Sequence, residues 1–160
     1  MSADRPPRIL LVCTGNTCRS PMAAGLMRRA AERRGIELEV ASAGTAAAPD
    51  APAAPEAVAA LLEKGVDLSS HRARRLEAPD VEAADLVLTM TAAHRDRVLE
   101  LAPGARDRVH TLSEYATGEA SDIPDPLGAG LERYRETAQV LERLVEAALD
   151  RYLQERGRPS

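Results

Sequence analysis

Residues 9–22 read ILLVCTGNTCRSPM: an apolar run, eight small or polar residues that include both cysteines of the chain, and the start of a predicted helix. The run from Arg8 to Val12 is typical of a buried parallel strand. Ser20 and Pro21 predict the N-cap and the first residue of a helix that ends at Gly35. A strand that passes through a short turn into a helix is the opening unit of an α/β sheet.

The rest of the chain repeats this alternation. Further strands are predicted over residues 37–42, 85–89 and 108–112, and helices over 55–65, 91–101 and from Gly128 onward, after a long acidic connection over 113–126. The chain is therefore predicted to be one α/β domain over residues 1–160, with a four-stranded parallel sheet, helices on both faces and flexible ends at 1–7 and 155–160. Ligands of such sheets bind at the carboxyl ends of the strands, where residues 13–20 lie.

Composition excludes several classes of protein. The 160 residues, 44% of them apolar, suffice for one core, and a net charge of −4 provides no surplus to neutralise nucleic-acid phosphates. The first residues lack the layout of a signal peptide, and no apolar run reaches the length of a membrane span. We expect a cytoplasmic protein without membrane or nucleic-acid partners. Its thiols stay reduced there, so the two cysteines point to catalysis or redox chemistry.

The turn has the form C-x5-R, from Cys13 to Arg19. Gly15 and Asn16 tolerate the left-handed backbone that lets successive amides point into one concavity, and the following helix adds the positive end of its dipole. Arg19 offers a planar two-pronged donor for a phosphoryl group, and a cysteine in this field loses its proton easily and becomes a nucleophile. The turn is therefore predicted to be a phosphate-binding loop made of Thr14, Gly15, Asn16, Thr17, Cys18, Arg19 and Ser20.

Other readings of the turn find less support. The lysine of a nucleotide-binding phosphate loop and the dinucleotide fingerprint G-x-G-x-x-G are both absent from the sequence. A zinc site needs about four ligands, and two cysteines with the scattered His71, His94 and His110 do not supply them, so no metal or cofactor is expected. His94 and His110 are predicted to be surface or packing residues. The remaining alternative makes Cys13 and Cys18 small buried hydrophobic residues at a strand–helix corner.

The stretch CTGNTCRSPMA resembles the signature of the low-molecular-weight protein tyrosine phosphatase family. The resemblance continues over most of the chain, through SAG at 42–44, HRAR at 71–74, ADLVLTM at 84–90 and the Asp125–Pro126 pair. Within the family the sequence looks most like the bacterial protein arginine phosphatases, whose loop also reads CTGNTCRS. The resemblance implies a phosphatase that hydrolyses phosphoarginine on proteins through a phosphocysteine intermediate, without a metal.

The resemblance also implies roles for individual residues. Cys13 would attack phosphorus, Arg19 and the loop amides would bind the phosphoryl oxygens, and Ser20 would hydrogen-bond the thiolate. Asp125 would be the general acid and then the general base. On the sequence alone, Asp122 and Asp125 both lie in SDIPDPLG, and Asp–Pro is also an ordinary turn signal. The residues that would support the shape of the loop are Asn16, Ser42 and His71.

Two positions bear on the substrate. Thr17 stands where tyrosine phosphatases of this family usually carry an aliphatic residue, and Leu127 stands where an aromatic residue usually follows Asp–Pro. A phosphotyrosine ring would find no stacking partner, which favours phosphoarginine. The arginine phosphatases also favour an aromatic residue at the position of Leu127. A low-molecular-weight protein tyrosine phosphatase therefore stays the alternative.

Further alternatives are an arsenate reductase and a non-catalytic phosphate-binding module. The first relays a disulfide through downstream cysteines, and none follows Cys18. The second would be expected to lose its nucleophile or its acid, and both are present. Cys18 lies five residues after Cys13, so the two sulfurs are expected to form a disulfide when Cys13 is oxidised. The expected partners are phosphorylated proteins, and the expected state is a monomer.

Overall fold

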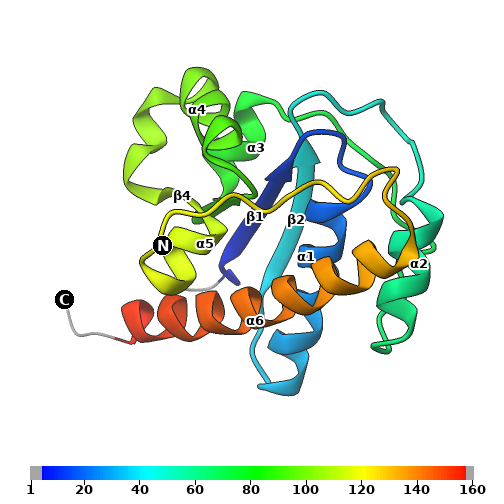
Figure 1. Cartoon of the computed structure of the whole chain (residues 1–160). Coiled ribbons are helices and arrows are strands. Elements are labelled where there is room, and N and C mark those ends of the chain that lie inside the picture. The colour runs from blue at the N-terminus through cyan, green and yellow to red at the C-terminus, as the bar shows by residue number, and fades with distance from the viewer. Residues whose placement is uncertain (1–4, 158–160) are drawn as a thin grey trace.

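Four parallel strands form the sheet in the computed structural model, which describes residues 5–157. They are β1 (Arg8–Cys13), β2 (Glu39–Gly44), β3 (Leu86–Thr89) and β4 (Val109–Thr111), in the order β2-β1-β3-β4. The predicted parallel sheet is confirmed. β1 is central, with Val12 opposite Ala43 on one side and Thr89 on the other, so the residues after Cys13 emerge at the middle of the sheet (Figure 1).

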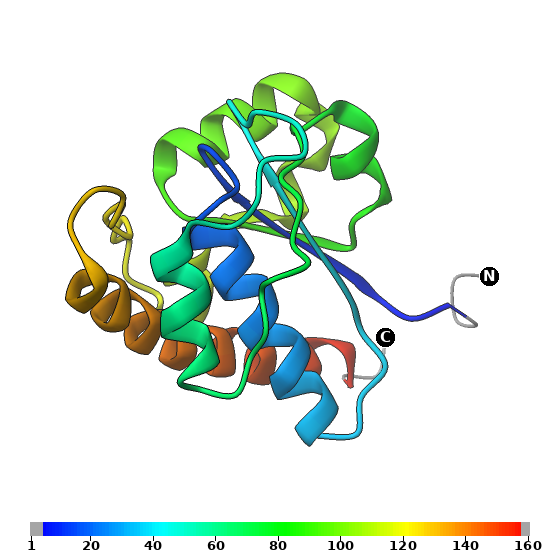
Figure 2. The same cartoon turned by 90° about the vertical axis from the view of Figure 1, so that its right-hand side faces the viewer.

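Helices cover both faces of the sheet, as predicted. Figure 2 shows α1, α2 and α6 on one side of the strands and α3 and α4 on the other. The bounds are α1 (Arg19–Arg33), α2 (Pro55–Leu62), α3 (Ala78–Ala83), α4 (Ala92–Leu101), the 3₁₀ helix η2 (Pro103–Arg108), α5 (Leu112–Thr117) and α6 (Leu131–Arg156).

The core has two parts because successive side chains of β1 point to opposite faces. Ile9 and Leu11 join the apolar cluster beneath α1, α2 and α6, whereas Leu10 and Val12 join the cluster beneath α3 and α4. Side chains of β1 from Ile9 to Cys13 are almost fully buried. The strand that leads into the loop is therefore held from both sides.

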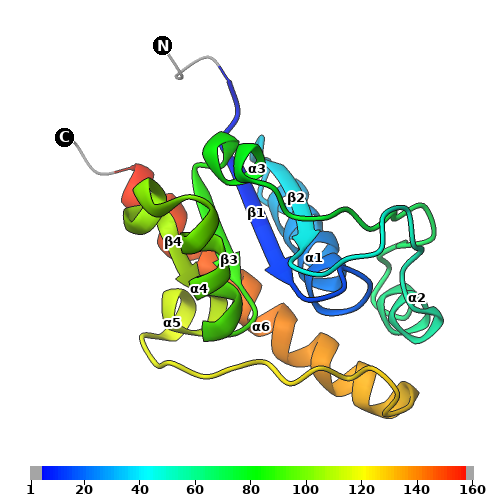
Figure 3. The same ribbon diagram turned by 90° about the horizontal axis from the view of Figure 1, so that it is seen from above.

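Two local predictions were wrong. The segment 113–126 was expected to be a connection, but α5 occupies its start: Thr111 Oγ1 accepts the amide of Glu114, and the helix ends at Gly118 with φ 83°. The connection is therefore shorter and runs from Gly118 to Gly130 along the edge of the molecule toward which the strand arrows point (Figure 3). Ser20 was expected to cap α1, but the helix begins at Arg19 with Cys18 as N-cap, and Ser20 lies inside its first turn.

The end of β2 lies directly against the loop. The amides of Thr45 and Ala46 donate to the carbonyls of Cys13 and Thr14, both at 2.9 Å. A Cβ atom on Gly44 would overlap the carbonyl oxygen of Thr14. This position therefore requires glycine, because the backbone of β2 and that of the loop touch there.

The two ends of the chain leave part of the prediction untested. α6 is helical through Arg156, while residues 1–4 and 158–160 lie outside the described part. The flexibility of 1–7 and 155–160 and the assignment of all 160 residues to one domain stay predictions. Within residues 5–157, no helix combines the length and the apolar character needed to cross a membrane.

Candidate active site

A small cleft of about 120 Å³ opens where the loop leaves the carboxyl end of β1. It joins two segments that lie more than a hundred residues apart in the sequence, the loop after β1 and the connection before α6. Most of the residues singled out from the sequence meet there. The cleft is lined by Cys13, Thr14, Gly15, Thr17, Cys18, Arg19, Asp125 and Leu127.

The Cys13 thiol lies at the base of this cleft. Its side chain is almost fully buried, and Sγ is 2.9 Å from Ser20 Oγ. Asn16 Nδ2 donates to the same Ser20 oxygen at 2.8 Å. Because that bond uses a lone pair of Ser20, its hydroxyl hydrogen is free to be donated to the Cys13 sulfur.

The side chain of Asn16 holds the loop from inside. Its Nδ2 also donates to Ser42 Oγ at 2.9 Å, and its Oδ1 accepts the backbone amide of Arg74 at 3.0 Å. The residue is fully buried and has a φ of 57°, the left-handed conformation predicted for it, whereas Gly15 does not have a positive φ. One amide side chain thus satisfies groups from α1, β2 and the segment before α3.

His71 supports the same residue from its backbone side. Its Nε2 lies 2.7 Å from the carbonyl oxygen of Asn16. Since a carbonyl can only accept, Nε2 carries the hydrogen. Burial lowers the pKa of His71, which keeps the ring neutral near pH 7.

Arg19 joins the loop to the connection before α6. Its guanidinium is almost completely buried, and Nη1 donates to the carbonyl of Ile123 at 2.9 Å. Nη2 lies 3.4 Å from Thr14 Oγ1 and 3.5 Å from Asp125 Oδ2. The cation is therefore fixed beside the cleft by groups on both walls.

The sequence offered two carboxylates, Asp122 and Asp125, as candidates for the acid, and their surroundings in the structure differ. Asp125 lines the cleft with a half-exposed side chain, and its Oδ1 accepts the amide of Leu127 at 3.1 Å. Asp122 instead accepts the amide of Ala92 at 2.9 Å, at the start of α4. Of the two, only Asp125 lines the cleft, with its Oδ2 beside Arg19.

His94 was predicted to be a surface or packing residue, but it lies against the loop. It is buried, and its Nε2 is 2.8 Å from Thr14 Oγ1. Burial and the Arg19 cation lower its pKa to about 4. One feature of the sequence could have predicted this contact. His94 comes shortly after β3, and the carboxyl ends of β3 and β1 lie at the same edge of the parallel sheet, where the loop begins.

Tyr134 also reaches the site, although its place on the apolar face of α6 suggested only packing. Its hydroxyl is 3.2 Å from Cys18 Sγ. Burial raises the pKa of Cys18 and also that of Tyr134. Both groups are therefore protonated at pH 7, and one donates to the other.

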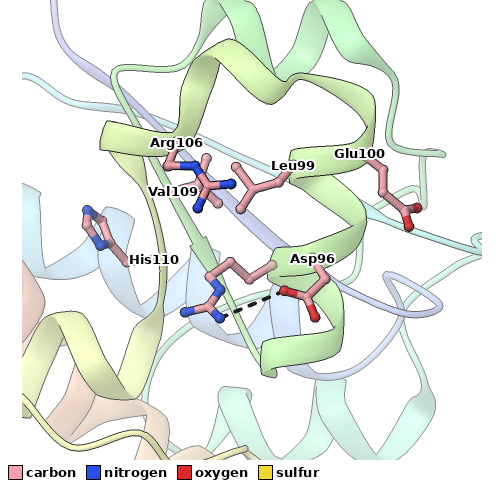
Figure 4. Close-up of a pocket in the computed structure, with 7 residues that line it drawn as sticks. Asp96, Leu99, Glu100, Arg106, Val109 and His110 are labelled. Carbon is pink, nitrogen blue, oxygen red and sulfur yellow. Dashed lines mark ion pairs between the residues drawn. The ribbon is translucent and has the colours of Figure 1, made fainter.

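A second cavity, of about 500 Å³, lies beside α4 and β4 (Figure 4). Its lining residues include no cysteine or serine and carry charges of both signs, so they point to no particular reaction. Within residues 5–157, no three His, Cys, Asp or Glu side chains are grouped so that they could hold a metal ion. The second cavity is lined by Arg95, Asp96, Leu99, Glu100, Arg106, Val109 and His110.

Comparison with known proteins gives consistent matches. The family model of the low molecular weight phosphotyrosine protein phosphatases matches residues 8–158. The protein-arginine-phosphatase of Bacillus subtilis is 45% identical over 137 residues, which cover 86% of this chain and 91% of that protein. A probable low molecular weight protein-tyrosine-phosphatase EpsP of Ralstonia nicotianae is 37% identical and covers 89% and 94%.

Solved structures agree with these matches. One is the YwlE arginine phosphatase in a cysteine-to-serine mutant form with a phosphorylated active-site serine. It superposes with a TM-score of 0.87 at 41% identity and covers 94% of this chain and 97% of that one.

The Asn16 network generates a prediction about stability. Asn16→Ala leaves Ser20, Ser42 and the Arg74 amide without their partner and keeps a non-glycine residue at positive φ. We expect the free energy of unfolding to fall by about 2–4 kcal/mol in urea titrations followed by circular dichroism. Asp50→Ala is the matched control, because Asp50 has a φ of 67° but its exposed side chain carries no such network. Equal losses in the two variants would contradict the importance of the hydrogen bonds.

Proposed function

The chain belongs to the low molecular weight phosphotyrosine protein phosphatase family, and from this premise we propose that it hydrolyses phosphoarginine on proteins through a phosphocysteine intermediate. The observation that carries the proposal is the convergence of Cys13, Arg19 and Asp125 on one cleft at the end of β1. A thiol, a buried guanidinium and a carboxyl group in the same cleft are the groups that this reaction needs.

In the first step the phosphoryl oxygens bind to the loop amides and to Arg19. The Cys13 thiolate, stabilised by the Ser20 hydroxyl, attacks phosphorus; the S–P bond forms as the P–N bond of phosphoarginine breaks. Asp125, in its protonated form, gives its proton to the leaving nitrogen, so that arginine departs as its ordinary guanidinium cation. The buried Arg19 holds the charge on the transferring group throughout.

In the second step a water molecule takes the place of the leaving group. The Asp125 carboxylate removes a proton from this water, its oxygen attacks phosphorus, and the S–P bond breaks. Inorganic phosphate leaves and the Cys13 thiolate is regenerated. No atom outside the loop, Asp125, water and the substrate takes part in either step.

The walls of the cleft support an arginine substrate. Thr17 and Leu127 line it together with Asp125, and no aromatic side chain is among the lining residues. A phosphotyrosine ring would have only the exposed Leu127 to pack against. The Asp125 carboxylate can pair with the N–H groups of a guanidinium, which needs no flat apolar wall. A phosphoarginine substrate is also supported by the 45% identity to a Bacillus subtilis protein named protein-arginine-phosphatase.

Phosphorylated proteins are the proposed partners, and a monomer is the proposed state. We place the activity in the cytoplasm, where the free thiols of Cys13 and Cys18 would stay reduced between turnovers.

The acid role of Asp125 is tested by Asp125→Asn. We expect kcat to fall by roughly 10²–10⁴-fold, with the largest loss for substrates with poor leaving groups, because the leaving atom must then depart without a proton. Asp122→Asn is the matched control, since that side chain is bound to the amide of Ala92. Steady-state kinetics on a series of aryl phosphates with graded leaving groups measures both. A larger loss in Asp122→Asn would transfer the role to that residue.

The substrate is tested by Thr17→Ile. Wild type is expected to have the higher kcat/KM on phosphoarginine peptides than on phosphotyrosine peptides. Isoleucine replaces the hydroxyl with hydrocarbon and adds a methylene group at the mouth of the cleft. The ratio of the two kcat/KM values should therefore shift toward phosphotyrosine by roughly 10–200-fold.

Cys13→Ser is the control for hydrolysis that does not depend on the nucleophile, because this variant should still bind an oxyanion but should not turn over either substrate. Preference of the wild type for phosphotyrosine would identify the chain as a tyrosine phosphatase of the same family. An unchanged ratio in Thr17→Ile would mean that another position sets the selectivity.

We also propose that Cys18 protects the nucleophile from oxidation. Peroxide converts the Cys13 thiolate to a sulfenic acid; the Cys18 thiol then displaces water and a disulfide forms. Activity lost to mild peroxide should return with dithiothreitol in wild type. In Cys18→Ser the same dose should leave a larger irreversible loss, measured as activity after reduction. Equal recovery in both proteins would reduce Cys18 to a packing residue against Tyr134.

A further inference from the structure

The hydroxyl oxygen of Thr14 has two side-chain nitrogens beside it. His94 Nε2 is 2.8 Å away and Arg19 Nη2 is 3.4 Å away. Arginine can only donate, so the longer contact uses one lone pair of the Thr14 oxygen. The direction of the shorter bond then depends on which nitrogen of His94 carries the hydrogen.

The surroundings of His94 decide that question. The ring is buried, and its Nδ1 has no hydrogen-bond partner among the described residues. With a pKa of about 4 the ring is neutral at pH 7, so one nitrogen alone carries a hydrogen. A buried N–H without an acceptor is rarer in proteins than a buried acceptor without a donor. The hydrogen therefore belongs on Nε2, which donates it to Thr14.

The Thr14 oxygen then accepts two hydrogen bonds, from His94 and from Arg19, and both of its lone pairs are used. The Thr14 hydroxyl hydrogen cannot be donated to these two nitrogens, because both already donate to the oxygen. It can therefore be donated to a group bound in the cleft, which Thr14 lines together with Cys13. We propose that His94 is a positioning residue that turns the Thr14 hydroxyl into an additional hydrogen-bond donor for the bound phosphoryl group. This inference rests on the proposed phosphatase function and adds a residue pair to its oxyanion site.

The proposal is tested with inorganic vanadate, a mimic of the transferring phosphoryl group, as an inhibitor of aryl phosphate hydrolysis. His94→Phe and Thr14→Val should each raise the inhibition constant about tenfold, the effect of one hydrogen bond to a charged group. The double variant should be no worse than either single variant, because both remove the same bond. His110→Phe is the matched control: this half-buried histidine lies beside the second cavity and should leave the constant unchanged.

A conservative variant separates positioning from packing. His94→Gln places an amide N–H near the position of Nε2 and should recover most of the vanadate affinity that His94→Phe loses. Thermal unfolding of each variant shows whether it folds. Long-range ¹H–¹⁵N spectra of the wild type report the tautomer without any substitution, and they should show His94 protonated on Nε2.

Three outcomes would overturn the proposal: a hydrogen on Nδ1, an unchanged constant in His94→Phe, or additive effects of His94→Phe and Thr14→Val. Each of these leaves the phosphatase function intact. A wild type that neither hydrolyses aryl phosphate nor binds vanadate would instead contradict the proposed function.

Discussion

The shape of the loop between β1 and α1 depends on one buried amide side chain. Asn16 adopts a left-handed conformation, and its side chain bonds to Ser20, Ser42 and the backbone of Arg74. The amides that would bind a phosphoryl group lie on the same short turn, so their direction follows from this one residue. The network also aims the Ser20 hydroxyl at the Cys13 sulfur. In the proposed mechanism, oxyanion binding and activation of the nucleophile would therefore depend on the same contacts, which are present without a substrate.

The cleft combines a rigid wall with a less constrained one. The loop side is held by β1, by the end of β2 at Gly44 and by the first turn of α1. The opposite wall, with Asp125 and Leu127, belongs to the irregular segment between α5 and α6 and is largely exposed. In the proposed mechanism, the side chains that would contact the leaving group are those of this second wall and Thr17. Such a division would let the preference for the leaving group change while the binding of the phosphoryl group stays the same.

Much of the site could be predicted because its central part is local in sequence. The strand, the C-x5-R spacing and the Gly15–Asn16 pair all fall within the first 20 residues, where spacing alone fixes which atoms can meet. His94, Ile123 and Tyr134 reach the loop only through tertiary packing, and the local pattern around each of them does not show that contact. Ser20 was misread because serine before proline is a common N-cap, whereas here its hydroxyl is bound within the loop network. α5 was missed because its six residues are too few for a helical periodicity to be recognised in the sequence.

The buried guanidinium of Arg19 connects the loop to the segment that carries Asp125. One of its nitrogens holds the carbonyl of Ile123, and the other lies beside Asp125. The group that would bind an oxyanion therefore also contacts the wall that carries Asp125. By thermodynamic linkage, if anion binding at Arg19 depends on these two contacts, a change in the contacts alters anion affinity by the same factor by which the anion alters the contacts. A protein substrate that presses on the segment around Leu127 would then change phosphoryl affinity without touching the loop.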